Sequence, residues 1–132
     1  MNNIHAFKAL ILKYESITQD MINGCDSDSN ESIAEQLTGF GGTQTCTLCI
    51  SAKKQNDNHH WDKDGNYFCN NCIWRKYTKR ASGLMGYDCL DSEHGIYVTW
   101  SLISEHPDQP EHYHERAKLM RSVLKELGYK QP

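Results

Sequence analysis

Residues 46–72 read CTLCISAKKQNDNHHWDKDGNYFCNNC, and this stretch decides which fold the sequence predicts. It contains two Cys-x-x-Cys pairs, Cys46 with Cys49 and Cys69 with Cys72, separated by nineteen residues. A Cys-x-x-Cys turn presents two sulfur atoms to one metal ion, and two pairs at this spacing are typical of structural zinc modules. Four thiolates complete the tetrahedral coordination of Zn²⁺. The sequence therefore predicts one zinc ion held by these four cysteines.

Three other interpretations of the cysteine pairs compete with a structural zinc site. A thioredoxin-like redox centre needs a βαβ setting, and no βαβ pattern surrounds either pair. A disulfide framework is typical of secreted chains. The first twenty residues show neither a basic leader nor a small-residue cleavage site, so we expect a cytoplasmic protein. A catalytic zinc site keeps one position open, and the sequence leaves open whether His59 or His60 contacts the metal.

Composition places the chain among ordinary globular proteins. It has 132 residues, 38% of them apolar and 23% charged, with a formal net charge of −3. We expect one domain over residues 1–132, with a helical N-terminal segment at 1–40, a zinc finger at 46–80 and a helical C-terminal segment at 90–128. No apolar run approaches the roughly eighteen residues that a membrane span needs, so we expect no membrane contact.

Hydrophobic periodicity predicts helices on both sides of the cysteine pairs. Residues 3–22 carry an apolar stripe at 3-4 spacing, and a shorter helix is expected from Ser29 or Asn30 to Gly39. Residues 92–105 combine strand-favouring residue types with a helical apolar face, and we predict a helix there, capped by Ser92. From Asp108 the chain predicts a helix with a capping box and Pro110 in its first turn. Its expected core face is Tyr113, Ala117, Met120, Leu124 and Leu127.

Between the pairs, the sequence HHWDKDGNYFC has the form of a β-hairpin. Asp64, Gly65 and Asn66 supply the turn, because Gly and Asn adopt positive φ at little cost. A helix can continue after the second pair. The predicted fold class is thus a small α+β fold: a four-cysteine zinc finger, built of a knuckle, a β-hairpin and a helix, flanked by N-terminal and C-terminal α-helices.

A basic segment follows the second cysteine pair directly. Residues 65–87 contain four basic residues and no acidic one, although the whole chain is acidic. Basic side chains release counterions from phosphates, and aromatic rings can stack on bases. The tentative binding residues, for nucleic acid or for another partner, are Trp74, Arg75, Lys76, Lys79 and Arg80. Against this stands a solvated helix face with the aromatic rings packed internally, an interpretation that the net charge favours.

The sequence WDKDGNYFCNNC followed by a basic helix resembles the second half of GATA-type zinc fingers over residues 46–80. The resemblance implies a treble-clef arrangement, with Cys46, Cys49, Cys69 and Cys72 as zinc ligands and a helix starting at the second pair. The loop between the pairs is longer than in that family, and WDKD stands where the family has arginines beside its tryptophan. The flanking segments resemble small uncharacterised zinc-finger proteins of phages and mobile elements.

These features predict a non-enzymatic, zinc-stabilised protein-interaction or regulatory factor. The resemblance of the flanking segments implies that a phage or mobile element encodes it. A protein partner is expected and nucleic acid is possible. The alternative function is a nucleic-acid-binding zinc finger that uses residues 75–80, and a zinc enzyme is the third. No phosphate loop and no His-Glu-x-x-His motif occurs. The sequence assigns no role to Cys25 or Cys89 and does not indicate the oligomeric state.

Overall fold

The structure is a computed structural model, and it describes residues 4–26, 30–38, 73–74, 76–77 and 95–132. This part of the chain is 77% helical and contains no strand. The prediction of a small α+β fold is therefore wrong, because the described protein is mostly helical. The residues expected to form the knuckle and the β-hairpin lie outside the described residues. What the described residues build is a core between amphipathic helices.

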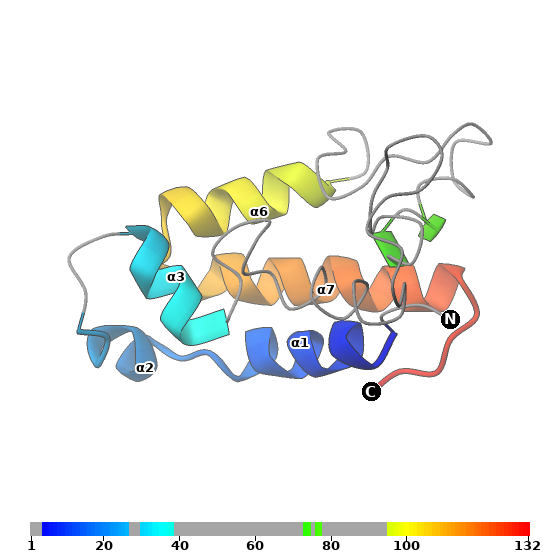
Figure 1. Cartoon of the computed structure of the whole chain (residues 1–132), viewed down its shortest axis with the longest axis horizontal. Helices are drawn as coiled ribbons and strands as arrows, with labels where there is room; N and C mark the ends of the chain where they lie inside the picture. The colour runs from blue at the N-terminus through cyan, green and yellow to red at the C-terminus, as the bar shows by residue number, and fades with distance from the viewer. Residues whose placement is uncertain (1–3, 27–29, 39–72, 75, 78–94) are drawn as a thin grey trace, which may run out of the picture.

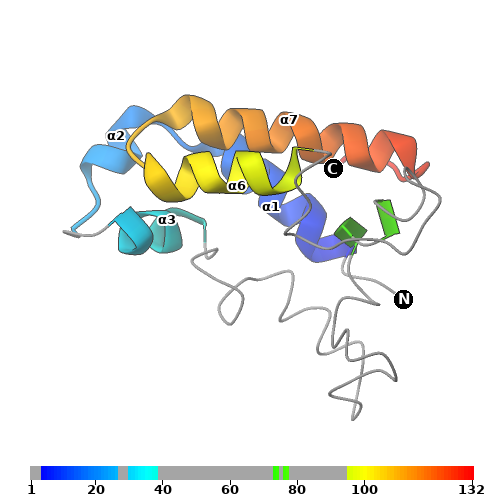
Figure 2. The same cartoon turned by 90° about the horizontal axis from the view of Figure 1, so that it is seen from above.

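Three longer helices form the scaffold, and two shorter ones cover one end of it. Helix α7 packs against α1 on one side and against α6 on the other, and α3 contacts both α6 and α1. Figure 1 shows α7 between α6 and α1, and Figure 2 shows it from above, along one edge of the helices with α6 beside it. Residues 73–74 and 76–77 are also helical. The helix bounds are α1 Ile4–Ser16, α2 Gln19–Asn23, α3 Asn30–Thr38, α6 Ile96–Glu105 and α7 Pro110–Glu126.

The N-terminal segment is two helices rather than the single helix predicted over residues 3–22. Helix α1 ends at Ser16, and Thr18 adopts an extended conformation with φ −119° and ψ 165°. The Thr18 hydroxyl accepts a hydrogen bond from the Met21 backbone N–H at 3.3 Å, which makes it the N-cap of α2. Threonine is a favoured N-cap residue because its oxygen satisfies a backbone donor that has no partner within the helix. The chain therefore turns here although the apolar stripe continues.

The ambiguous segment before residue 105 is a helix, as predicted, but it begins later than the expected Ser92 cap. Its N-cap is Gly95, at φ 77°, a left-handed conformation that glycine adopts without steric cost. Ile96 and Ile103 lie two turns apart on the same face and are both buried, whereas Trp100 is half-buried. Ser92 lies outside the described residues. Burial against α7 therefore decides this segment in favour of helix over its strand-favouring composition.

Helix α7 buries most of the face that its periodicity predicts. Tyr113, Ala117, Met120 and Leu124 are fully buried, whereas Leu127 is half-buried at the end of the helix. The helix also buries Val123 and Arg116. The predicted capping box is absent: the N-cap is Gln109, which makes no side-chain cap hydrogen bond, and Pro110 opens the first turn. Proline suits that position because its missing N–H would have no helical partner there.

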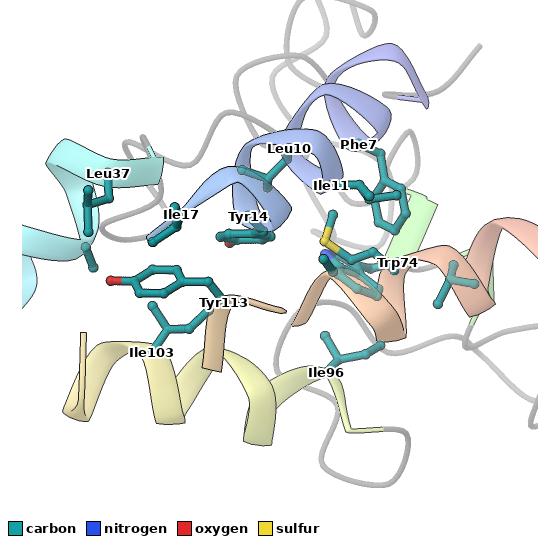
Figure 3. Packing of buried hydrophobic residues seen from close by; sticks show 14 of the residues in the cluster. Phe7, Leu10, Ile11, Tyr14, Ile17, Leu37, Trp74, Ile96, Ile103 and Tyr113 are labelled. Atoms are coloured by element: carbon teal, nitrogen blue, oxygen red, sulfur yellow. The ribbon is translucent and has the colours of Figure 1, made fainter. Parts of the chain in front are cut away.

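The core is one cluster shared by all the described helices (Figure 3). Phe7, Ile11 and Tyr14 from α1 face Tyr113 of α7 and Ile96 of α6, with Trp74 inserted between them.

The Tyr113 hydroxyl donates a buried hydrogen bond to the Pro107 carbonyl at 2.8 Å, and burial raises the pKa of this phenol above its usual value. Within the described residues, no helix is long and apolar enough to cross a membrane.

Candidate functional site

The four predicted zinc ligands, Cys46, Cys49, Cys69 and Cys72, lie outside the described residues, as do His59, His60 and Cys89. In the described part of the chain, no three His, Cys, Asp or Glu side chains gather closely enough to hold a metal ion. Cys25 is a half-buried free thiol there, and its Sγ donates to the Met21 carbonyl at 3.6 Å. The zinc site thus stays a prediction.

Trp74, predicted as a possible base-stacking residue, is a core residue. Its side chain is 1% exposed. The Phe7 ring meets the indole edge-on, with ring centroids 4.9 Å apart and an interplanar angle of 73°. Figure 3 shows the indole between the start of α1 and Ile96 of α6. Such edge-to-face pairs add stability beyond their buried area. A ring held in this way has no free face for a base, so Trp74 is not part of a nucleic-acid surface in this structure.

The guanidinium of Arg116, on α7, lies over the Trp74 ring with its Cζ 4.7 Å from the ring centroid. Arg116 is fully buried, which is rare for arginine. Its Nη1 donates to the Ile96 carbonyl and, at 2.8 Å, to the Thr99 hydroxyl, both in the first turn of α6. A cation removed from water is stabilised by hydrogen bonds and by the face of an aromatic ring. One side chain thereby joins α6, α7 and residues 73–74.

Lys76, two residues after Trp74, is exposed, but its side chain contacts another part of the protein. Its Nζ donates to the Tyr129 hydroxyl at 2.6 Å and lies 4.8 Å from the centroid of the same ring. Tyr77 is half-buried and packs against the core cluster. Arg75, Lys79 and Arg80 lie outside the described residues. Of the five tentative binding residues, the structure therefore describes two, and both make contacts within the protein.

Tyr129 belongs to the C-terminal tail, residues 127–132, which turns back at the end of α7. Gly128 at φ 77° makes the turn, and the Tyr129 backbone N–H donates to the Leu124 carbonyl at 2.9 Å. Further along the tail, Gln131 donates through Nε2 to the Arg121 carbonyl at 3.0 Å. Arg121 also donates to Gln131 Oε1 at 3.2 Å. The tail is thus held on α7 while it presents Tyr129 to Lys76.

Arg121 also joins α7 to α1 by a two-pronged ion pair with Glu15. Its Nε donates to Oε2 at 2.5 Å and its Nη2 donates to Oε1 at 2.7 Å. These hydrogen bonds, with the positive charge, hold the pKa of Glu15 below its usual value and raise the pKa of Arg121. Both side chains are about one-third exposed, so this pair contributes less than a buried one would.

Together, residues 73–74 and 76–77 form the anchor, which three other parts of the chain hold. Phe7 of α1 and Arg116 of α7 hold Trp74, and Tyr129 of the tail holds Lys76. Sequence reasoning selected Trp74 and Lys76 but missed Arg116 and Tyr129. The signal available for Arg116 was its position, because it directly precedes Ala117, a residue of the predicted core face. Nothing in the sequence pattern of the tail indicates Tyr129.

A second surface feature lies on α6. Tyr97 and Val98 are 40% and 50% exposed, although both are large apolar residues. The Tyr97 ring lies against the half-buried Trp100, with centroids 5.8 Å apart. In this helix the only ionisable side chain besides that of Tyr97 is Glu105, in the last turn. Exposed apolar residues with few charges around them are typical of protein-contact surfaces.

Comparisons with protein-family models, with curated proteins and with solved structures found no match.

Proposed function

We propose that this protein is a non-enzymatic, zinc-stabilised interaction factor, in which a four-cysteine zinc module is anchored on a helical scaffold that contacts a protein partner. The observation that carries the proposal is the anchor. Ile73 and Trp74 directly follow Cys72 in the sequence, and both of these side chains are buried in the scaffold core. Trp74, which a free nucleic-acid-binding finger could present to a base, is here part of the scaffold core.

The donor set suits zinc. Cys46, Cys49, Cys69 and Cys72 would supply four soft thiolates, and four thiolates close the coordination shell of a structural ion. The ion would supply folding free energy to the residues around it and no open position for a substrate. Purified protein should therefore contain about one zinc per chain by elemental analysis. A Cys69→Ser variant should contain clearly less, and a zinc-free wild-type protein would contradict this part of the proposal.

The partner surface that the described residues offer is the exposed apolar pair on α6, Tyr97 and Val98. Protein-contact surfaces are rich in such aromatic and aliphatic side chains and poor in charge. The basic segment offers less to nucleic acid than its sequence indicates, because Trp74 is buried and Lys76 contacts Tyr129. The net charge of −3 also opposes binding to phosphates.

A quantitative pull-down with zinc-loaded protein tests the partner surface. Wild type, a Tyr97→Ser/Val98→Ser variant and a Leu12→Ser control are compared with and without nuclease. Leu12 is 50% exposed on α1, so the control removes an exposed apolar side chain of similar kind from another helix. We expect nuclease-resistant partners that the α6 variant loses and the control keeps. Partners that disappear on nuclease treatment would favour the nucleic-acid-binding alternative instead.

A further inference from the structure

No residues separate the last predicted zinc ligand from the anchor. Cys72 is followed at once by Ile73, which is fully buried, and by Trp74, which is 1% exposed. A metal that fixes the backbone at Cys72 therefore fixes the chain within one or two residues of the scaffold core. A flexible linker would let the zinc module and the scaffold fold independently. Because the sequence has no linker between Cys72 and Ile73, ordering of the chain at Cys72 is passed on to the anchor.

The scaffold holds this short segment from several sides. Trp74 contacts Phe7 of α1 at 4.9 Å between ring centroids and lies beneath the Arg116 guanidinium of α7 at 4.7 Å. Outside the core, Lys76 contacts Tyr129 of the tail. The first and the last helix of the described scaffold thus meet at a segment that adjoins the cysteine set. Ordering this segment removes part of the conformational entropy that the scaffold must otherwise overcome to bury Trp74.

We propose that metal occupancy of the four-cysteine set controls the stability of the helical scaffold, with the anchor as the coupling element. The inference rests on the zinc site of the proposed function and adds a regulatory consequence to it. A ligand that binds only when a segment is ordered stabilises everything that depends on that order. By the same linkage, contacts that the scaffold makes with the anchor raise the affinity of the cysteine set for zinc. Loss of the metal then loosens α1 and α7.

The first test follows the scaffold directly while zinc is removed from the full-length protein. Zinc content is measured by elemental analysis, and amide hydrogen exchange is followed by mass spectrometry for peptides covering residues 4–16 and 110–126. We expect chelation to accelerate exchange in both helices and to lower the midpoint of thermal unfolding measured at 222 nm. Complete loss of zinc with unchanged exchange in α1 and α7 would overturn the coupling while leaving the zinc site standing. Protein that never contains zinc would overturn the proposed function as well.

The second test uses the reciprocal effect, and it needs a variant that keeps its fold. Phe7→Leu removes the edge-to-face contact with Trp74 but keeps an apolar side chain in α1. Its matched control is Ile103→Val, which trims a buried residue of α6 that lies beside Tyr113 and away from Trp74 (Figure 3). Zinc affinity is measured by competition with a chromogenic chelator. We expect Phe7→Leu to bind zinc at least about 5-fold more weakly than wild type, within the usual range of coupling between sites. Equal affinities in the two variants would refute the anchor as the coupling element.

Discussion

Replacing Arg116 tests whether the anchor is held by volume or by charge. The side chain is fully buried, lies over Trp74, and donates to the Ile96 carbonyl and the Thr99 hydroxyl. Three substitutions separate its contributions. Arg116→Met keeps most of the volume without the charge, Arg116→Lys keeps the charge without the planar donor fork, and Arg116→Ala removes both.

The magnitudes follow from these contacts. Each hydrogen bond from a charged donor contributes about 1.5–3 kcal/mol, and a desolvated cation over an indole contributes about 2 kcal/mol. Against them stands a desolvation cost of several kcal/mol for the buried cation. Because these terms nearly offset one another, the methionine variant should lose at most about 1.5 kcal/mol. The alanine variant also leaves a cavity, which costs about 2–5 kcal/mol for side chains of comparable length. The lysine variant should be less stable than the methionine variant, since it retains a buried charge with poorer hydrogen-bond geometry.

Urea unfolding of zinc-loaded protein, followed by circular dichroism at 222 nm, measures these differences. Lys118→Met is the control, because Lys118 is exposed on the same helix and should tolerate the change. The expected order of stability is wild type, methionine, lysine, alanine. If methionine proved as damaging as alanine, the charge-specific contacts would outweigh the packing, and the argument that desolvation offsets them would be wrong.

The remaining predictions concern the scaffold. Met120→Ala should cost about 2–5 kcal/mol in urea unfolding because the side chain is fully buried, whereas Lys118→Ala should be neutral, and equal losses would contradict the assigned core face. Tyr113→Phe should cost about 1 kcal/mol because it removes a buried hydrogen bond, and an unchanged unfolding midpoint would show that this bond contributes nothing. The pKa of Glu15 is lowered by Arg121, so the pair stabilises the fold above the unfolded-state value near 4.5 and stops doing so as pH falls through the lower folded value. Wild type should therefore exceed Glu15→Gln by at most about 1 kcal/mol at pH 7 in low salt, and a difference that persisted at pH 2 would refute this origin.

The anchor was only partly predictable from the sequence. Trp74 and Lys76 were selected as candidate binding residues because aromatic and basic residue types follow the second cysteine pair. The sequence could not show that Trp74 points into the core or that Lys76 contacts Tyr129, because the partners lie more than forty residues away in both cases. Arg116 interrupts an otherwise apolar helix face, and its burial depends on Trp74 arriving from another part of the chain.

Local sequence patterns determined most of the helices. A 3-4 apolar spacing requires one helix face to be buried, so α1 and α7 could be predicted along with most of the α7 core, and start and stop signals predicted α3. The break after Ser16 is local as well: the apolar stripe continues, yet the Thr18 hydroxyl caps α2 by accepting from the Met21 N–H three residues on. Tertiary structure decided what a local pattern leaves open. Strand-favouring residues in 96–105 form a helix because Ile96 and Ile103 are buried in the shared core. Burial in a shared core outweighs propensities of a few tenths of a kcal/mol per residue, and it depends on residues far apart in the chain.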